Sequence, residues 1–443
     1  MKAREGALRV LFDIEANKAY SNIALKKELK HNEFSQLDRA FISELVFGVL
    51  ENKLYLDHVI NQFSSIKTRR MNTHTLNLLR LGVYQIFLLD KIPVSAAVNE
   101  SVNLSKEYCE KSSGFINAVL RNIIRKKDFI KMPDAKIDVV KYLSVTYSHP
   151  EWMVKLFLEN YSESFTEELL KANNSTPSMY MRVNTLKISV EECIKLLTNE
   201  GYIVKRNDFV EEALLVEGSI NLDKLGLLDK GYLYIQDIGS MLVSILTEPK
   251  ENEVIIDLCS APGGKATHLA QIMNNKGKII ARDIYEHRLE LISKNAKRLG
   301  IDIIQVEKYD GLKLDSSMIE KADKVLVDAP CSGLGIIRRK PDIKYNISKK
   351  NIEELTKIQK KILLNASKYL KSGGELIYST CTINPSENEL MIEQFLKTNS
   401  NFELIDLTKK YKKTQFDTNK KTIQLYPNIQ NSDGFFIAKM RKK

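Results

Sequence analysis

The sequence predicts a chain of several domains: an N-terminal all-α domain, a small α+β module, and a C-terminal α/β domain with a doubly wound sheet. Apolar residues recur at helical spacing as far as about Lys131, and short alternating segments follow as far as Thr247. Strand and helix patterns then alternate as far as Lys439. We therefore expect domains at residues 1–132, 139–247 and 248–443.

The composition is that of an ordinary globular protein, with 43% hydrophobic and 28% charged residues. No apolar run approaches the roughly 20 residues that cross a bilayer. The first twenty residues alternate charges with apolar positions, which predicts an amphipathic helix and not a signal peptide. We expect a cytoplasmic protein without a membrane segment. The net charge of +11 favours a polyanionic partner such as RNA, although a lysine-rich proteome would produce the same charge.

The five cysteines are too scattered for a disulfide scaffold, and the absence of a C-x-x-C pair argues against a zinc site. Cys109 and Cys193 lie in helical patterns, where we expect buried thiols. Cys259, Cys331 and Cys381 each follow a predicted strand of the α/β segment. This clustering indicates a chemical role.

The N-terminal segment carries apolar stripes at helical spacing, such as Leu76, Leu79 and Val83, flanked by arginine and lysine. Its stretches RLGVY, IPVSAAVNE and FINAVLR resemble the helical RNA-binding domain of the NusB family. A linker around Pro133 ends the segment. The basic residues are solvated faces or contacts to an RNA backbone.

The middle segment begins with a helix start at Ser148–Trp152, where Pro150 suits the first turn. We expect His149 to be a structural or capping residue and not a catalyst. A helix is predicted at Val190–Asn199. Strands are predicted at Met179–Asn184, Tyr202–Lys205, Ala213–Val216 and Tyr232–Ile235.

The C-terminal segment has the alternation typical of a parallel sheet. Strands are predicted at Val254–Asp257, Lys278–Asp283, Ile303–Val306, Lys324–Asp328, Glu375–Ser379 and Gly434–Lys439. Helices are predicted at Ala266–Met273, Glu286–Leu299, Asn351–Leu370 and Pro385–Thr398, with a loop at Lys409–Lys413. The last of these helices begins within NPSE, which has the form of a capped start with Asn384 as the cap, Pro385 in the first position and Glu387 in the third.

The stretch VIIDLCSAPGGK is a buried strand, a small-residue turn and a helix start, with Gly263 and Gly264 allowing a ligand close to the backbone. Neither G-x-G-x-x-G nor a P-loop fits, because Cys259 replaces the first P-loop glycine and Ala266 follows Lys265. S-adenosylmethionine is the remaining common ligand of such a turn. Asp283, at the end of the next strand, would bind its ribose, although an acid there binds the ribose of NAD equally well.

Asp283, Asp310 and Asp328 follow successive strands, at the edge of an open α/β sheet where ligands bind. The stretch DAPCSG places Cys331 after Asp328, and STC places Cys381 after the next strand. A thiolate added to C6 of cytosine makes C5 electron-rich enough to accept a methyl group. A base must then remove the C5 proton before the thiolate can leave.

These motifs together resemble the RNA 5-methylcytosine methyltransferases. With the helical domain, their order resembles the RsmB (Sun or Fmu) group, which acts on 16S ribosomal RNA. Ile336–Asp342 and Asp433–Phe436 match the same group, whereas Leu334 stands where its members often have threonine. The resemblance implies a Rossmann-like methyltransferase domain and S-adenosylmethionine as the cofactor. It also implies cytosine 967 of 16S rRNA, free or in a small-subunit precursor, as the target.

Residue by residue, the resemblance implies that Cys381 is the nucleophile and that Cys331 assists product release. Asp328 would also hydrogen-bond the cytosine, and Lys265 would orient the base or the cofactor. Cofactor contacts are implied for Cys259, Ser260, Ala261, Pro262, Gly263, Gly264, Lys265, Asp283, Asp310 and Asp328. We expect a monomer without a metal ion.

Two other functions fit parts of the sequence. A non-catalytic, antitermination-like RNA-binding protein would explain the basic helical domain, but it leaves the two thiol motifs without a role. An NAD-dependent enzyme would need the glycine fingerprint that the chain lacks.

Overall fold

The computed structural model describes residues 2–218, 226–408 and 420–443 and divides into two compact units. One unit comprises Met1–Ser175 with Ile337–Asn346, and the other comprises Thr176–Ile336 with Ile347–Lys443. In the described ranges, every helix is too short or too polar to span a membrane. The two units are fewer than the three predicted domains, so the predicted boundaries at 1–132, 139–247 and 248–443 stay a prediction.

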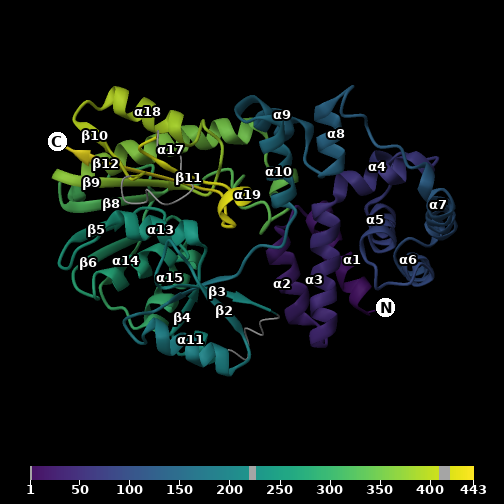
Figure 1. Ribbon diagram of the computed structural model, residues 1–443, viewed down its shortest axis with the longest axis horizontal. Helices are drawn as coiled ribbons and strands as arrows, with labels where there is room; N and C mark the ends of the chain where they lie inside the picture. The colour runs from purple at the N-terminus through teal and green to yellow at the C-terminus, as the bar shows by residue number, and fades with distance from the viewer. Residues whose placement is uncertain (1, 219–225, 409–419) are drawn as a thin grey trace. The chain divides into compact units, whose positions relative to one another are not determined.

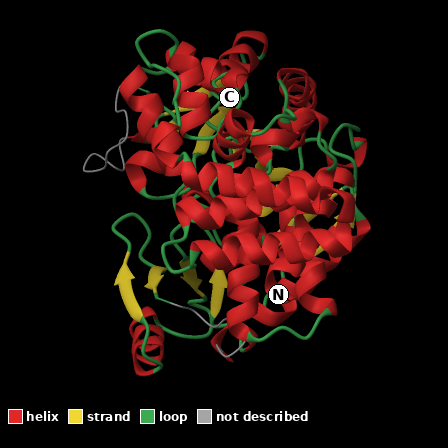
Figure 2. Ribbon diagram, turned by 90° about the vertical axis from the view of Figure 1, so that its right-hand side faces the viewer, coloured by secondary structure: helices red, strands yellow, loops and turns green. Residues whose placement is uncertain are grey.

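The first unit is built from helices, as the apolar stripes predict (Figures 1 and 2). Leu76, Leu79 and Val83 are buried on α5 (Thr73–Leu88), which contacts α1, α3, α4, α6 and α7. The other helices are α1 (Lys2–Ala16), α2 (Ser21–His31), α3 (Gln36–Glu51), α4 (Lys53–Phe63), α6 (Val94–Tyr108), α7 (Ser113–Arg125), α8 (Val139–Thr146), α9 (Glu151–Asn160), α10 (Glu163–Asn173) and α16 (Ile343–Asn346), with 3₁₀ turns η1 (Thr68–Arg70), η2 (Glu110–Ser112) and η3 (Lys127–Phe129).

Buried polar side chains tie this unit together internally. The ring Nδ1 of His149 lies 2.6 Å from the carbonyl oxygen of Tyr147, which confirms a structural histidine. In the returning segment Ile337–Asn346, Lys344 donates to the carbonyl of Glu51 at 2.8 Å and to Asn174 at 3.0 Å. Burial disfavours the charged form and lowers the pKa of Lys344 to about 7, and its hydrogen bonds go to protein acceptors in place of solvent.

The second unit begins with a small antiparallel sheet of order β2-β3-β1-β4, as predicted for the middle segment (Figure 1). Ser189 and Glu192 form a capping box at the start of α11, whose bounds are those predicted. The elements are β1 (Tyr180–Val183), α11 (Val190–Asn199), β2 (Ile203–Arg206), β3 (Ala213–Glu217), α12 (Gly226–Asp229), β4 (Leu233–Ile235) and α13 (Ile238–Thr247).

The larger sheet has the order β10-β12-β9-β8-β5-β6-β7, with β11 paired to β12. The run from β9 to β7 is parallel, as predicted, but β12 is antiparallel to β9, so a purely parallel sheet was wrong. The elements are β5 (Val254–Asp257), α14 (Gly264–Ile272), β6 (Lys278–Asp283), α15 (Glu286–Leu299), β7 (Ile304–Lys308), η4 (Ser316–Met318), β8 (Ala322–Asp328), α17 (Lys349–Tyr369), β9 (Leu370–Thr380), α18 (Glu389–Thr398), β10 (Phe402–Ile405), β11 (Ile423–Leu425), α19 (Pro427–Gln430) and β12 (Phe435–Lys442).

Both faces of this sheet are covered, because successive strand residues point to opposite sides. Ile255 joins the core formed with α13, α14 and α15, whereas its neighbour Ile256 joins the core formed with α17. Leu326 and Val327 of β8 divide in the same way. Because helices cover both faces of the sheet, a ligand site can form only at the strand ends and the loops that follow them.

Three local expectations need correction or completion. Helix α18 begins at Glu389 and not at Pro385, and its N-cap residue, Asn388, makes no side-chain cap because its side chain bonds to Thr380, Thr382 and Gln424. Cys193 is buried as expected, but Cys109 is only partly buried at the end of α6. Strands β10 and β11 were not anticipated, and the predicted loop Lys409–Lys413 lies outside the described residues.

Candidate active site

The glycine turn has the predicted strand–turn–helix form. Gly263 lies at φ 95° at the N-cap of α14, a conformation that favours glycine. A Cβ atom there would also lie 3.2 Å from the backbone of Ile292. Backbone bonds from Ser260 to the carbonyl of Arg282 (2.9 Å) and from Gly263 to that of Ser260 (2.7 Å) fix the turn. The first N–H groups of α14 are thus presented at a rigid turn.

Asp283 is connected to this turn through Arg288. Asp283 ends β6 and is only 3% exposed. One Nη atom of Arg288 lies 3.3 Å from its carboxylate, and the other donates to the carbonyl of Ala261 at 2.9 Å. Asp310 instead accepts from the backbone N–H of Leu312 (3.0 Å) in its own turn after β7.

Lys265 and Asp328 meet directly. The ammonium of Lys265 lies 2.8 Å from one carboxylate oxygen of Asp328, and Ser379 donates to the other oxygen at 2.8 Å. The same ammonium lies 4.9 Å from the ring centroid of Phe435. The start of α14 and the carboxyl ends of β8 and β9 are therefore joined around a single carboxylate.

The two thiols that the sequence singles out also meet. The sulfur atoms of Cys331 and Cys381 lie 3.0 Å apart, and the backbone N–H of Cys381 donates to the sulfur of Cys331 at 3.3 Å. Hydrogen bonding to Cys381 and burial raise the pKa of Cys331 well above its usual value. Burial likewise raises the pKa of Cys259, which follows β5 in the glycine turn. Cys331 and Cys259 therefore keep their protons at neutral pH.

Glu387 joins the two thiol loops, a role that sequence reasoning missed. Its buried carboxylate accepts from the backbone N–H of Ser332 (2.8 Å), from Gln359 (3.0 Å) and from Asn384 (3.0 Å). The hydroxyl of Ser332 donates to it as well. Its one signal in the sequence, the NPSE pattern, was read as a helix cap.

Asp257 was also missed as a site residue. It is fully buried at the end of β5, and neither carboxylate oxygen has a hydrogen-bond partner in the described part of the chain. The hydroxyl of Ser260 is likewise buried without a hydrogen bond there. Burial raises the pKa of Asp257 to about 7, although the Ser260 hydroxyl and the Cys259 N–H, which lie nearby but outside hydrogen-bond geometry, act to lower it. An acid that ends an otherwise apolar strand was the available signal.

Arg182 donates hydrogen bonds to the first turn of α14. This buried guanidinium on β1 donates to the carbonyl of Gly264 at 2.8 Å and to the hydroxyl of Thr267 at 3.1 Å. Burial lowers its pKa to about 9. Within the described ranges, no group of His, Cys, Asp and Glu side chains is arranged to hold a metal ion.

Comparison with known proteins identifies the family. The family described as 16S rRNA methyltransferase RsmB/F matches residues 244–441, the NusB family matches 1–125, and an RsmF/B-like ferredoxin-like domain matches 149–223. A Bacillus subtilis (strain 168) protein named "Probable ribosomal RNA small subunit methyltransferase B" is 38% identical, covering 99% of this chain and 98% of the relative. The chain belongs to the RsmB/F family.

Other relatives agree with this assignment. The ribosomal RNA small subunit methyltransferase B of Escherichia coli O7:K1 is 33% identical, covering 97% of this chain and 96% of its own. The solved structure titled "Crystal Structure of PH0851" has a TM-score of 0.83 at 28% identity, covering 99% and 98% of the two chains. NSun6 from Pyrococcus horikoshii with SFG has a TM-score of 0.60 at 28% identity, covering 66% of this chain and 98% of NSun6.

Membership of the RsmB/F family makes the protein an rRNA methyltransferase and confirms the predicted NusB-like and Rossmann-like folds. The NAD-dependent and non-catalytic alternatives are thereby set aside.

Proposed function

We propose that this RsmB/F protein methylates C5 of a cytosine in 16S rRNA through a transient bond between Cys381 and C6 of the base. The observation that carries the proposal is the 3.0 Å separation of the two sulfur atoms, at the ends of adjacent parallel strands. A methyl transfer to oxygen or nitrogen needs no thiol, whereas C5 of cytosine becomes nucleophilic only after a sulfur adds to C6.

The two thiols have different surroundings, and we assign them different roles. Because Cys331 keeps its proton, we assign it the role of hydrogen-bond donor and assign the attack on C6 to the thiolate form of Cys381. The S–H group of Cys331 then donates a hydrogen bond to the thiolate. After methylation, a base removes the C5 proton, and the electron pair of that C–H bond re-forms the C5–C6 double bond and expels the Cys381 thiolate. We place Cys331 in this release step as a hydrogen-bond donor, because its S–H group can stabilise the departing Cys381 thiolate while a separate base takes the C5 proton.

Asp328 and Lys265 position the base. Asp328 is held by Lys265 and Ser379, so its carboxylate has a fixed place beside the thiols. We assign to it a hydrogen bond with the cytosine ring. Lys265, fixed by its ion pair and by Phe435, orients the base or the cofactor.

S-adenosylmethionine, when bound, supplies an electrophilic methyl group. The residues of the turn fit it, because within the described ranges neither the buried carboxylate of Asp257 nor the hydroxyl of Ser260 has a partner at hydrogen-bond geometry, and the polar groups of the cofactor would provide one. Asp283 would bind the ribose hydroxyls, and Asp310 would lie near the adenine. The turn itself would contribute Cys259, Ser260, Ala261, Pro262, Gly263 and Gly264.

The proposal extends to cytosine 967, which the family resemblance implies, and to a monomer that acts in the cytoplasm. Mapping 5-methylcytosine in 16S rRNA from cells with and without the protein tests the position. A methyl mark that persists without the protein would contradict it.

The mechanism is tested with three cysteine variants on small-subunit rRNA. We expect Cys381→Ala to abolish methylation while calorimetry still shows S-adenosylmethionine binding. Cys331→Ala should retain a covalent protein–RNA adduct on a denaturing gel, because release fails. Cys193→Ala, in α11 of the small module, is the control and should methylate normally. Full activity of Cys381→Ala would refute the covalent mechanism.

A further inference from the structure

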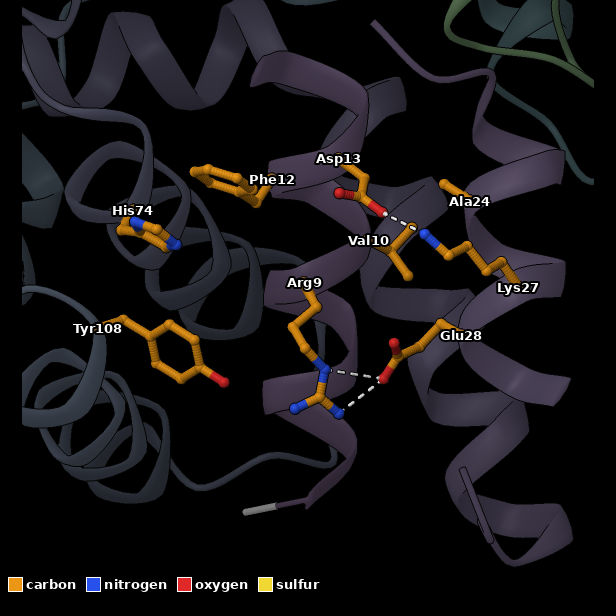
Figure 3. Close-up of a pocket in the computed structure, with 9 residues that line it drawn as sticks. All are labelled: Arg9, Val10, Phe12, Asp13, Ala24, Lys27, Glu28, His74 and Tyr108. Carbon is orange, nitrogen blue, oxygen red and sulfur yellow. Dashed lines mark hydrogen bonds and ion pairs between the residues drawn. The ribbon is translucent and has the colours of Figure 1, made fainter. Parts of the chain in front are cut away.

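A cavity of about 410 Å³ lies within the helical unit, among α1, α2, α5 and α6 (Figure 3). Nothing in the proposed methyl transfer uses it. Its volume is within the range of about 300–1,000 Å³ that is typical of small-ligand sites. In Figure 3, aromatic side chains gather on one side of α1 and charged side chains on the other.

The aromatic side combines rings from three helices. The rings of Phe12 and His74 are stacked, with centroids 4.3 Å apart and an interplanar angle of 11°. The ring of Tyr108 follows 5.5 Å from His74, tilted by 36°. Burial lowers the pKa of His74, so its ring is neutral at pH 7. Such contiguous rings suit the face of another planar ring.

The charged side of the cavity carries as many cations as anions. Arg9 donates to Glu28 at 2.7 Å and is also paired with Glu5, and Lys27 lies 4.0 Å from Asp13. The cavity lining therefore holds two cations, Arg9 and Lys27, and two anions, Asp13 and Glu28. A bare phosphate gains little from a neutral lining, whereas a planar group with both donors and acceptors on its edge can bond to both signs.

We propose that this cavity binds one unstacked base of the RNA substrate, with the rings of His74 and Tyr108 against the base and the ion pairs at its edge. This inference rests on the proposed function, which makes rRNA the partner. Lysines flank the cavity on α2, where Lys26, Lys27 and Lys30 are exposed and can contact the phosphates on either side of the base. The site would hold the substrate by a nucleotide other than the one that is methylated.

The test measures binding of a small-subunit rRNA transcript to the full chain. His74→Leu and Tyr108→Leu keep apolar bulk but remove the stacking ring, and each should raise Kd on the order of tenfold. Phe129→Leu is the matched control, because Phe129 is 72% exposed on η3 of the same unit and does not line the cavity. It should leave Kd unchanged. Binding of S-adenosylmethionine should be the same in all three variants.

Photo-cross-linking locates the base on the unmodified chain, so the test holds even if a variant fails to fold. A transcript carrying 4-thiouridine should cross-link to peptides that contain His74 or Tyr108. Cross-links confined to other peptides, with unchanged Kd in both variants, would overturn the proposal. Free adenosine or uridine that displaces the cross-link at the concentration of the RNA would also overturn it, because the cavity would then bind a free nucleoside.

Methylation of the same transcript separates this inference from the proposed function. If the wild-type chain transfers methyl groups but the variants bind normally, the cavity proposal fails and the function stands. If cross-links form in the cavity but no 5-methylcytosine appears, the function fails and the cavity proposal stands.

Discussion

Asp257 and Glu387 are both buried carboxylates near the reacting strand ends, yet their surroundings are opposite. Glu387 accepts hydrogen bonds from Ser332, Gln359 and Asn384. Asp257 accepts none within the described ranges. A buried carboxylate without partners costs stability, whereas a bonded one fixes the groups around it. The difference indicates that Glu387 belongs to the framework of the site and Asp257 to the binding of a ligand.

The largest expected effect comes from removing the bonded carboxylate. Glu387→Ala removes the acceptor of the Ser332 N–H, of the Asn384 side-chain amide and of one of the two bonds of the Gln359 amide, and each orphan donor costs about 1–3 kcal/mol. We expect the free energy of unfolding to fall by about 5 kcal/mol and methylation to be lost. Urea unfolding and a methylation assay measure the two effects.

Glu387→Gln is the control for this change, because it keeps the shape and one oxygen acceptor. Its loss of stability should be clearly smaller than that of Glu387→Ala. If the alanine variant were as stable as the wild type, Glu387 would not hold the site together and its contrast with Asp257 would be wrong.

The next effect is the pH dependence that Asp257 confers. Burial raises its pKa in the folded protein to about 7, above the value of about 4 in an unfolded chain. Its contribution to stability is therefore complete below pH 4 and is lost as the pH rises through 7. At about 1.4 kcal/mol per pKa unit, the ceiling of this loss is about 4 kcal/mol. Asp257→Asn, which cannot ionise, should gain stability relative to the wild type between pH 5 and pH 8 in urea unfolding. If the stability of Asp257→Asn and that of the wild type changed with pH in the same way, the raised pKa of Asp257 would be contradicted.

Affinity for the cofactor provides the third test. Asp257→Asn removes the negative charge of an acceptor that a ligand would pair with, and hydrogen bonds to charged groups are worth about 1.5–3 kcal/mol. We expect S-adenosylmethionine to bind roughly 10- to 100-fold more weakly by calorimetry at pH 8, while the ligand-free protein melts no earlier than the wild type. Unchanged affinity would mean that Asp257 is only a buried structural acid.

Local pattern was enough to predict much of the fold and of the site. Helix α15 has the predicted bounds, Glu286–Leu299, because its apolar spacing and its C-terminal Gly300 are both local signals. The glycine turn was predicted for the same reason. The placement of Cys331 and Cys381 in one crevice was predicted from topology, since Cys381 directly follows β9 and Cys331 lies three residues after β8, and these strands are adjacent and parallel. Their 3.0 Å contact was not predicted.

Long-range partners explain what was missed. The NPSE pattern has the form of a local cap, but Glu387 bonds to Ser332 and Gln359, which lie 55 and 28 residues away, and the helix starts at Glu389. Similarly, the final strand pattern does not reveal its direction, so the antiparallel β12 looked like another parallel strand.

The smallest expected effect tests whether cofactor affinity comes from the backbone of the glycine turn or from the carboxylate of Asp257. Thr267 donates to the carbonyl of Gly263 at 2.8 Å and accepts from Arg182 at 3.1 Å. Thr267→Val keeps the shape but loses both bonds, so we expect a loss of about 1 kcal/mol in stability and a weakening of cofactor affinity by a few-fold. Thr247→Val is the matched control, because Thr247 is equally buried and bonds only within α13, to the carbonyl of Val243. If Thr267→Val weakened S-adenosylmethionine binding as much as Asp257→Asn, the backbone of the turn, and not the unpaired carboxylate, would be the main source of affinity.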